Sequence, residues 1–235
     1  MKKAIILLFF TIFFPIVPKV IFSSNDKIYQ EEILLYIKSF LPFDPVILEA
    51  GGHFGEDTIK MKSVWPNATI HVFEPLPSSF KKMVYDTKNL SLLYCYPYAL
   101  TTFVGTTNFY IDIPNNAASS IGYPVEWNES EFDKTPIQVS CTTINQWANL
   151  NNISKIDFMW LDMEGHELYA LQYASDILKT VKAIFTEISF VPIREGSCLY
   201  IDLKQFLESE DFVEVWKSSD DGTFGDALFV RKGIC

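Results

Sequence analysis

Apolar and polar positions along this 235-residue chain follow two periodicities from residue 26 onward. Five stretches carry apolar residues near the spacing of an amphipathic helix: 26–40, 53–66, 78–88, 166–179 and 200–210. Between and after them lie short apolar runs of strand length, at 45–52, 68–75, 91–100, 155–165, 181–190, 211–217 and 226–232. Pro66 is expected to end the second helix, Pro75 the second strand, and Ser78 to cap the third helix.

Short apolar strands that alternate with helices predict parallel pairing, because such strands are buried on both faces by the intervening helices. The last two strands are separated only by the turn-rich segment 218–225, which favours a hairpin. The pattern therefore predicts an α/β fold with a doubly wound, mostly parallel sheet and one antiparallel strand.

The segment from 106 to 138 interrupts this alternation. Residues 106–114 and 135–141 are strand-like, and the polar stretch 115–130 lies between them. We interpret the segment as an inserted hairpin with a lid-like loop over one end of the sheet. Tyr123 and Trp127 in that loop are suited to a sugar ring or another flat surface, so Trp127→Ala is expected to impair acceptor use and spare cofactor affinity.

Composition excludes one class of partner. The formal net charge is −10, and the lysines and arginines are scattered. Nucleic-acid binding needs clustered basic residues, so we expect no nucleic-acid partner. The length suits a single domain, which we place at residues 25–235.

Three glycines follow the first strand-like run in "VILEAGGHFGEDTIKM", residues 46–61. In a doubly wound sheet, ligands bind outside the carboxyl ends of the strands. Gly51 and Gly52 are expected to form a tight turn, and Gly55 to let the next helix begin close to the strand and to a ligand. The amides of that helix N-terminus add partial positive charge.

The second strand-like run ends in Glu74, at a spacing from the glycine loop that suits hydrogen bonds to both hydroxyls of a ribose. Glu49, at the start of the loop, would repel a pyrophosphate but suits a cationic amino group. A ligand with ribose hydroxyls and an amino-acid cation is S-adenosylmethionine. Taken singly, each feature is explained as well by a structural role as by ligand binding. The glycine turn could serve packing alone, and Glu74 could be a solvated acid at the end of a strand.

Several segments together resemble the FkbM family of S-adenosylmethionine-dependent methyltransferases, within the class I Rossmann-like group. The resemblance rests on "LEAGGHFGEDT", "VFEPLPSSF", "PYAL", the serine pair at 119–120, and "KIDFMWLDMEGHELYAL" followed by "FTEI". It runs from about residue 46 to residue 190. Two positions depart from the family pattern: His53 stands in the loop where a small or amide residue is usual, and Trp160 stands where lysine is common.

The resemblance implies a seven-stranded sheet with the last hairpin inserted and S-adenosylmethionine as the cofactor. It implies that Glu74 holds the ribose, that Ala99 and Leu100 flank the adenine, and that Asp162 lies beside the transferred methyl group. The cofactor contacts expected from these motifs are Glu49, Gly51, Gly52, His53, Gly55, Thr58, Glu74, Pro75, Ala99, Leu100 and Asp162. The acceptor contacts expected are Ser119, Ser120, Tyr123 and Trp127.

Methyl transfer to a hydroxyl depends on positioning and benefits from a general base. The candidate catalytic groups near the ends of the fourth and fifth strands are Asp162, Glu164, His166 and Glu187. Glu164 is equally suited to cap the following helix, and His166 is a surface or hydrogen-bonded residue in the alternative interpretation. An acid–histidine cluster can bind a divalent cation, but we find no convincing third ligand and expect no metal. The acceptor is expected to be a small molecule or a glycan.

Two other functions remain open at this point. Tyr200 and Lys204 match the Tyr-x-x-x-Lys pair of short-chain NAD(P)-dependent oxidoreductases, although the pattern is short and follows the fifth strand rather than the fourth. A non-catalytic Rossmann-like binding module is the other alternative. The intact acids and glycines of the loop argue against it.

Residues 1–24 differ from the rest. Lys2 and Lys3 precede an apolar run at 4–17, a length typical of a signal-peptide core and short for a membrane span. We expect an export signal or an uncleaved anchor, with membrane association through residues 4–22. Lys2 and Lys3 favour a cytoplasmic N-terminus, which would place the domain outside the cell, whereas the cofactor is made in the cytosol. The side of the membrane on which the domain lies therefore stays undecided, with the cytoplasmic face favoured by cofactor supply.

Overall fold

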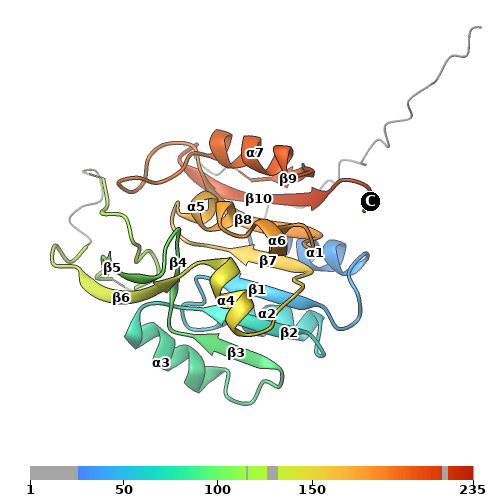
Figure 1. Cartoon of the computed structure of the whole chain (residues 1–235), viewed down its shortest axis with the longest axis horizontal. Coiled ribbons are helices and arrows are strands. Elements are labelled where there is room, and N and C mark those ends of the chain that lie inside the picture. Colours follow the sequence, from blue (N-terminus) through green and yellow to red (C-terminus); the bar gives the residue numbers. More distant parts are fainter. Residues whose placement is uncertain (1–25, 115, 126–131, 219–221, 235) are drawn as a thin grey trace, which may run out of the picture.

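A computed structural model describes residues 26–114, 116–125, 132–218 and 222–234. Its central sheet has seven strands in the order β3-β2-β1-β7-β8-β10-β9 (Figure 1). These strands are β1 (Val46–Ala50), β2 (Thr69–Phe73), β3 (Leu93–Tyr96), β7 (Phe158–Leu161), β8 (Ala183–Ser189), β9 (Phe212–Lys217) and β10 (Phe224–Arg231). All neighbours pair in parallel except β10, which is antiparallel to both β8 and β9. The predicted fold class is confirmed.

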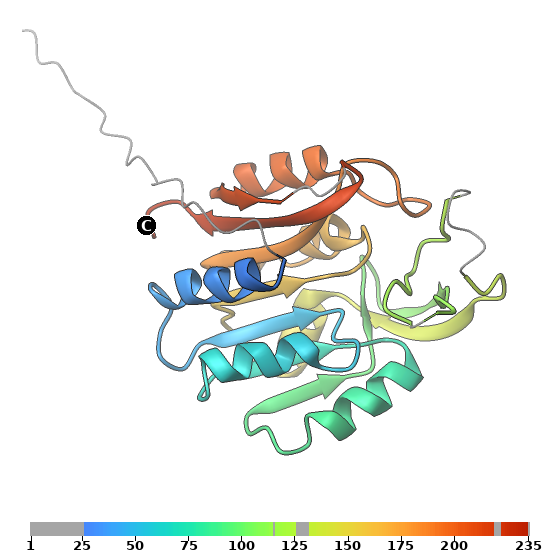
Figure 2. The same cartoon turned by 180° about the vertical axis from the view of Figure 1, so that it is seen from behind.

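Helices cover both faces of this sheet, as Figures 1 and 2 show from opposite sides. The helices are α1 (Asp26–Lys38), α2 (Glu56–Val64), α3 (Pro77–Asp86), α4 (Ile144–Leu150), α5 (Glu167–Gln172), α6 (Ser175–Leu178) and α7 (Tyr200–Ser209). Apolar side chains of α1 and α2 pack with one set of strand residues, and those of α4 to α7 pack with the other. These helices thus bury their apolar stripes against the sheet.

The alternation of side chains along β1 decides what faces each layer. Ile47 belongs to the core beneath α1 and α2, whereas Leu48 and Ala50 belong to the core on the opposite face. Glu49 therefore points to the side of Ile47, toward α2. Trp160 in β7 lies in the same core as Ile47 and packs 4.2 Å from the ring of Phe185, so its departure from the family pattern is explained by packing.

The predicted insertion is present as a second, three-stranded sheet in the order β4-β6-β5. Strands β5 (Gly105–Phe109) and β6 (Ile137–Thr142) form the expected antiparallel hairpin, and β4 (Ala99–Leu100) adds a parallel strand that the sequence analysis did not separate from β3. This sheet lies beside the carboxyl ends of the central parallel strands (Figures 1 and 2).

Two local predictions were wrong, and one helix was missed. Helix α3 begins at Pro77, whose missing N–H suits the first helical position, and its N-cap is Leu76, so the predicted cap at Ser78 is absent. The stretch 166–179 is two helices, because the Tyr173 carbonyl at the break accepts a hydrogen bond from the Asn145 N–H instead of continuing the helix. Helix α4 was missed, although Thr143 caps it by accepting from the Gln146 N–H.

The N-terminal apolar segment, residues 4–22, lies outside the described residues. Within the part of the chain that the structure describes, no helix combines the length and the apolar character needed to cross a bilayer.

Candidate functional site

A cavity lies where the carboxyl ends of β1, β2 and β7 meet the insertion. Its volume is about 290 Å³, at the lower end of the range of roughly 300–1,000 Å³ typical of small-molecule sites. Its walls come from the glycine loop, the start of α2, the segment 73–75, β4, the insertion at 116–121 and the β7–α5 turn. The cavity is therefore at the switch point that the fold class predicts.

The glycine loop forms one wall of this cavity, and its glycines are required by contacts within the protein. Gly51 has φ +88°, and a Cβ there would lie 1.9 Å from the backbone oxygen of Asp162. A Cβ on Gly52 would meet side chains of β2 and α3 at 2.4 and 2.7 Å. Gly55 packs against Thr87 and is not part of the cavity wall. The loop is thus pressed against β7 and α3, which leaves its outer backbone facing the cavity.

Glu74 lies at the end of β2 and lines the cavity, as the ribose-binding prediction requires. Its Oε2 accepts from the His53 N–H at 2.8 Å, and its Oε1 accepts from the Leu76 N–H at 2.7 Å. Burial raises its pKa to about 7, while the two backbone donors act in the opposite direction. A carboxylate retains lone pairs beyond two such bonds, so Glu74 can also accept from ligand hydroxyls.

Glu49 is not part of the cavity wall. Its side chain is fully buried toward α2, where Oε2 accepts a hydrogen bond from the Thr58 hydroxyl. Oε1 has no hydrogen-bond partner among the described residues, and burial raises the pKa of this carboxyl to about 8. The structure therefore brings Gly51, Gly52 and His53 to the cavity but not Glu49, Thr58 or Gly55. Glu49 lies outside the cavity wall because the alternation of side chains along β1 turns it toward α2.

The cavity also has an apolar part of its wall beside Glu74. Pro75, Ala99 and Leu100 line it, as predicted for the segment beside an adenine, and Phe73 and Tyr98 extend it. Ala99 and Leu100 are held in place because β4 pairs with β6 of the insertion. Such a surface suits the face of a flat heterocycle.

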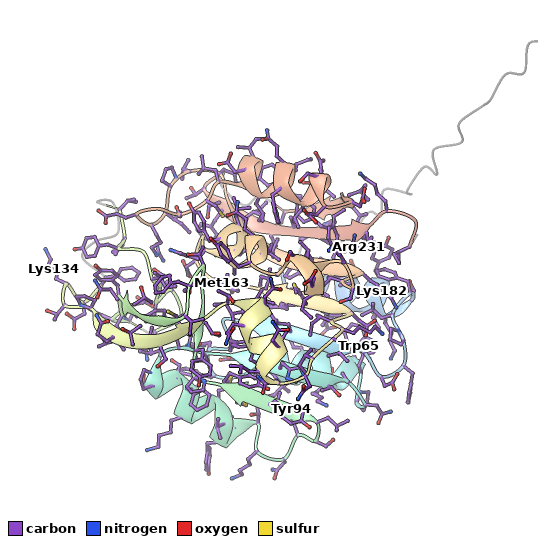
Figure 3. The ribbon with its side chains drawn as sticks, viewed as in Figure 1. Trp65, Tyr94, Lys134, Met163, Lys182 and Arg231 are labelled. Atoms are coloured by element: carbon purple, nitrogen blue, oxygen red, sulfur yellow. The ribbon has the colours of Figure 1, made fainter. Side chains whose placement is uncertain are left out.

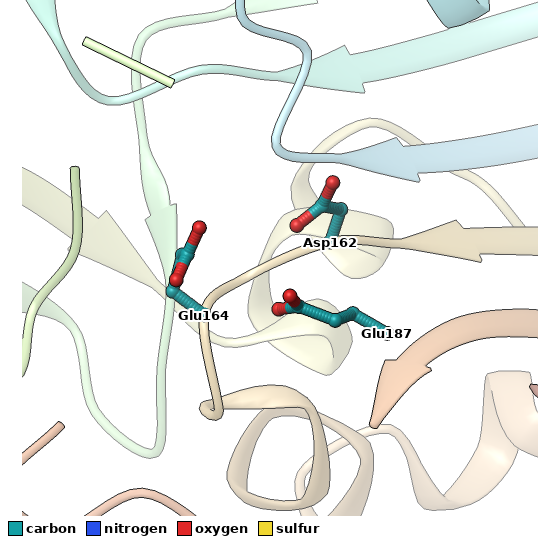
Figure 4. Close-up of side chains that lie close together, drawn as sticks. All are labelled: Asp162, Glu164 and Glu187. Atoms are coloured by element: carbon teal, nitrogen blue, oxygen red, sulfur yellow. The ribbon is translucent and has the colours of Figure 1, made fainter. Parts of the chain in front are cut away.

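Three carboxylates lie close together: Asp162 after β7 and Glu164 in the β7–α5 turn line the cavity, and Glu187 on β8 lies beside them outside the cavity wall (Figure 4). One oxygen from each lies within 4.8 Å of the others. Burial is the first cause that raises the pKa of each, and mutual repulsion adds to it for Asp162 and Glu187. Asp162 keeps contact with solvent through the cavity mouth but is enclosed by protein on its other sides.

Glu164 differs from the other two because it has a cationic partner. Its Oε2 accepts from Nη2 of Arg194 at 2.6 Å, and this guanidinium opposes the rise in the Glu164 pKa. No side chain of the described residues caps α5, so Glu164 does not have the capping role considered for it. The turn is held instead by Glu167, whose Oε1 accepts from the backbone N–H groups of Met163 and Gly165. That interpretation of Glu164 was wrong.

The carboxylate cluster also contains the ligand atoms that hard cations such as Mg²⁺ prefer. Glu187, which the sequence analysis named as a catalytic candidate and not as a metal ligand, supplies the third carboxylate of the cluster. Arg194 already offsets one negative charge in the cluster and opposes a bound cation. The expected absence of a metal stays a prediction.

His166 lines the cavity as the residue that precedes α5. Burial lowers its pKa to about 4, so the imidazole is neutral at pH 7. Its buried Nδ1 has no hydrogen-bond partner among the described residues. A neutral imidazole nitrogen without a partner can accept a proton or a hydrogen bond from a ligand hydroxyl.

Ser119 and Ser120 both line the cavity, but their hydroxyls are engaged inside the insertion. The Ser119 hydroxyl accepts from the Asp112 N–H at 3.0 Å, and the Ser120 hydroxyl donates to the Gly122 carbonyl at 2.8 Å. Tyr123 packs edge-on against Tyr110 and is not in the cavity wall. The fourth predicted acceptor contact, Trp127, lies outside the described residues.

Sequence reasoning missed several residues of the wall, among them Asp57, Lys60 and Asn116. Asp57 and Lys60 form an ion pair at 2.8 Å on the first turns of α2. Their position directly after the glycine loop is a signal that could have identified them. Asn116 comes from the insertion, where only the tertiary structure brings the loop to the sheet.

The Tyr-x-x-x-Lys pattern has a structural explanation away from the cavity. Tyr200 and Lys204 lie on α7, and both form hydrogen bonds with Glu214 on β9. Neither residue lines the cavity. The pair therefore joins a helix to the sheet edge, which removes the observation that favoured an oxidoreductase.

Comparison with known proteins agrees with this geometry. Residues 49–216 match the family model described as the methyltransferase FkbM domain. The chain is 25% identical over 219 residues to the 2-O-methyltransferase NoeI of Sinorhizobium fredii (strain NBRC 101917 / NGR234), covering 88% of this chain and 86% of that protein. It is 24% identical over 152 residues to Methyltransferase 1 of Beauveria bassiana (strain ARSEF 2860), covering 57% and 60%.

Solved structures share the fold. The Methanococcus jannaschii fibrillarin pre-rRNA processing protein superposes with a TM-score of 0.50 at 12% identity, covering 82% of this chain and 70% of that one. An rRNA methylase from Streptococcus thermophilus superposes with a TM-score of 0.50 at 8% identity, covering 89% and 98%. At this identity the likeness concerns the arrangement of strands and helices.

Proposed function

Because the chain belongs to the FkbM methyltransferase family, we propose that this S-adenosylmethionine-dependent enzyme methylates a hydroxyl group of a small molecule or glycan. The observation that carries the proposal is the family match over residues 49–216, which spans both walls of the cavity. The printed name of the relative NoeI, a 2-O-methyltransferase, supports an oxygen acceptor.

The residues of the cavity fit the cofactor. Glu74 offers a carboxylate to ribose hydroxyls, and Ala99 and Leu100 offer an apolar surface to the adenine. The backbone of Gly51 and Gly52 allows close approach of the amino-acid part. Glu49 fits less directly than expected, since its contact to Thr58 supports the loop from behind. When bound, S-adenosylmethionine supplies an electrophilic methyl group.

The acid side of the cavity supplies the groups that an acceptor hydroxyl needs. A positioned base within hydrogen-bond reach contributes about 10²–10⁴-fold to such a transfer. Glu164 and His166 are the strongest candidates, since Arg194 favours the charged form of Glu164 and His166 is neutral with an unpartnered Nδ1. Asp162, whose pKa is raised well above the usual range, lines the cavity and is better suited to orient the acceptor hydroxyl. Glu187 lies next to it and acts through it.

The cofactor part of the proposal is tested by isothermal titration of the whole chain with S-adenosylmethionine, S-adenosylhomocysteine and NADH. The sulfur compounds are expected to bind, and Glu74→Ala to weaken both by about 10- to 100-fold, as loss of hydrogen bonds to a charged group implies. Glu208→Ala, which removes an exposed carboxylate on α7, is the matched control. Binding of NADH alone would contradict the proposal.

The acceptor part is tested with labelled S-adenosylmethionine and a panel of methyl glycosides of the common pyranoses. Each glycoside is paired with its 2-deoxy counterpart, because the printed name of NoeI specifies position 2. Label in a glycoside but not in its 2-deoxy form would support a 2-hydroxyl acceptor. Cofactor binding without label in any sugar, combined with label in a phenol panel, would move the acceptor class away from glycans.

We also propose that residues 4–22 associate with a membrane at its cytoplasmic face, where the cofactor is available. The apolar composition of this segment after Lys2 and Lys3 supports the proposal. Fractionation of the full chain and of a variant lacking residues 1–24 tests it. Equal amounts of both in the membrane fraction would contradict it.

A further inference from the structure

Arg194 is a buried arginine in the connection between β8 and α7, with 3% of its surface exposed. Its side chain spans three segments that are far apart in the sequence. Nε donates to the Ser120 hydroxyl at 3.1 Å, and Nη2 donates to the Ala118 carbonyl at 3.0 Å and to Glu164 at 2.6 Å. Nη1 donates to its neighbouring carbonyl, that of Ile193, at 2.9 Å. Every nitrogen of the guanidinium therefore has an acceptor.

The backbone around Arg194 strengthens the same connection. Arg194 forms a β-bridge with Pro124, and the Glu195 N–H donates to the Tyr123 carbonyl at 2.7 Å. Its guanidinium also lies 4.9 Å from the centre of the Phe132 ring. The insertion is thus joined to the β8–α7 connection by backbone bonds, and to the β7–α5 turn through the Arg194 side chain.

Gly122 shows how closely these segments approach. A Cβ at this position would lie 2.7 Å from Cβ of Arg194, 2.7 Å from the Glu195 oxygen and 3.2 Å from Cε1 of His166. At Gly122 the insertion therefore packs closely against both Arg194 and His166. A lysine could supply the charge of Arg194 but not its planar set of donors, which reaches Ser120, Ala118 and Glu164 together.

We propose that Arg194 is the positioning residue for the acceptor side of the cavity: it holds the Glu164 carboxylate in place and joins the insertion to the β7–α5 turn. This inference rests on the proposed function, because it assigns that side of the cavity to the acceptor. Arg194 is not among the residues of the cavity wall, so it acts through Glu164 and residues 118–120.

The charge of Arg194 has a second consequence. Burial and Asp112 on the insertion raise the pKa of Glu164, and the Arg194 guanidinium is the cation that opposes them. Glu164 in turn raises the pKa values of its neighbours Asp162, Glu187 and Glu167. Without Arg194, the pKa of Glu164 is expected to rise further, and the carboxyl would be protonated at a higher pH.

The first test compares amide hydrogen exchange in the wild type, Arg194→Met and Arg194→Lys. Both variants are expected to raise exchange in peptides from 105–125 and 162–166, because neither methionine nor lysine restores all the donors. Arg231→Met is the matched control, since Arg231 donates only to carbonyls at the other end of the sheet, away from the cavity residue Met163 (Figure 3). Unchanged exchange at 105–125 in Arg194→Met would overturn the proposal.

The second test measures affinity for S-adenosylmethionine and S-adenosylhomocysteine between pH 5 and pH 9. The first ligand carries a sulfonium charge and the second does not, so the ratio of their affinities reports the charge of the carboxylates in the cavity. The pH at which this ratio changes is expected to move upward in Arg194→Met and to return toward the wild-type value in Arg194→Lys. A purely structural role would leave that pH the same in all three proteins, and this result would overturn the charge part of the proposal.

The two tests separate this inference from the proposed function. If the wild type binds neither sulfur compound, the proposed function fails, whereas the exchange measurement still decides whether Arg194 holds the insertion. If Arg194→Met does not fold, Arg194→Lys retains the charge and tests the loss of the planar donors alone. Exchange in Arg194→Lys equal to the wild type would then contradict the proposal.

Discussion

The two sides of the cavity are built in different ways. On the cofactor side, the glycine loop and Glu74 follow consecutive strands, and Glu74 contacts His53, which is 21 residues away in the sequence. On the acid side, Arg194 joins Ser120, 74 residues away, and Glu164, 30 residues away. Local backbone geometry thus determines the first side, whereas the second depends on the insertion and the two loops reaching their places together.

The largest effect is expected from breaking the backbone geometry of the cofactor side. In Gly51→Ala the new Cβ would lie 1.9 Å from the Asp162 oxygen, at a φ of +88° that disfavours alanine. We expect a loss of about 3 kcal/mol or more in the free energy of unfolding, measured in urea. Gly196→Ala, with a φ of +73° and no atom within 4 Å, controls for strain without a clash. Equal losses in the two variants would show that the contact with β7 is unimportant.

A smaller and more selective effect is expected on the acid side. In Gly122→Ala the new Cβ meets Arg194 and the Glu195 oxygen at 2.7 Å, so the insertion must shift. The expected cost is about 1–3 kcal/mol in thermal or urea unfolding. Affinity for S-adenosylhomocysteine is expected to change less than about threefold, because the cofactor side is built independently. A parallel loss of cofactor affinity would show that the two sides are coupled.

The pH dependence of stability tests whether the buried Glu49 carboxyl is protonated in the folded state. Burial raises its pKa from 4.5 to about 8, so the folded state keeps a proton that the unfolded state loses. The stability associated with that proton is complete below pH 4.5 and is lost as the pH rises toward 8. Glu49→Gln is therefore expected to raise the melting temperature at pH 8 by a few degrees relative to the wild type and to change it little at pH 4.5. A variant that is less stable at pH 8 would contradict this assignment.

The smallest effect is expected from chelation. Because the Arg194 guanidinium already pairs with Glu164, treatment with EDTA should leave the melting temperature and S-adenosylhomocysteine affinity unchanged. Titration with Mg²⁺, followed by calorimetry, is the complementary measurement. Mg²⁺ binding that is lost in Glu187→Gln would show that the three carboxylates form a cation site.

Much of the cofactor side could be read from the chain because its signals are local. Strand ends, glycines and the acid after β2 are short-range features, and they placed Gly51, Gly52, His53 and Glu74 correctly at the cavity. Glu49, predicted as a direct cofactor contact, lies outside the cavity wall for a local reason too, since the alternation of side chains along β1 puts it on the face of Ile47, toward α2.

Only part of the acid side could be predicted from the sequence. Asp162, Glu164, His166 and Glu187 were identified as chemically suitable. Their distances, the partner of Glu164 and the hydrogen bonds of Glu167 to the β7–α5 turn were not predicted. Arg194 lies in none of the motifs recognised in the sequence. Its importance arises from four acceptors on three segments, and no periodicity or spacing encodes such a meeting.

The sequence by itself determined the order of strands and helices, the antiparallel last hairpin, the family and the cofactor-side loop, because these depend on side-chain periodicity and on residues close together in the chain. Only the tertiary structure decided which carboxylates lie close together and which of them Arg194 pairs with. The physical reason is that charge and burial act through space: the pKa values of Asp162, Glu164 and Glu187 are set by neighbours that the fold brings together.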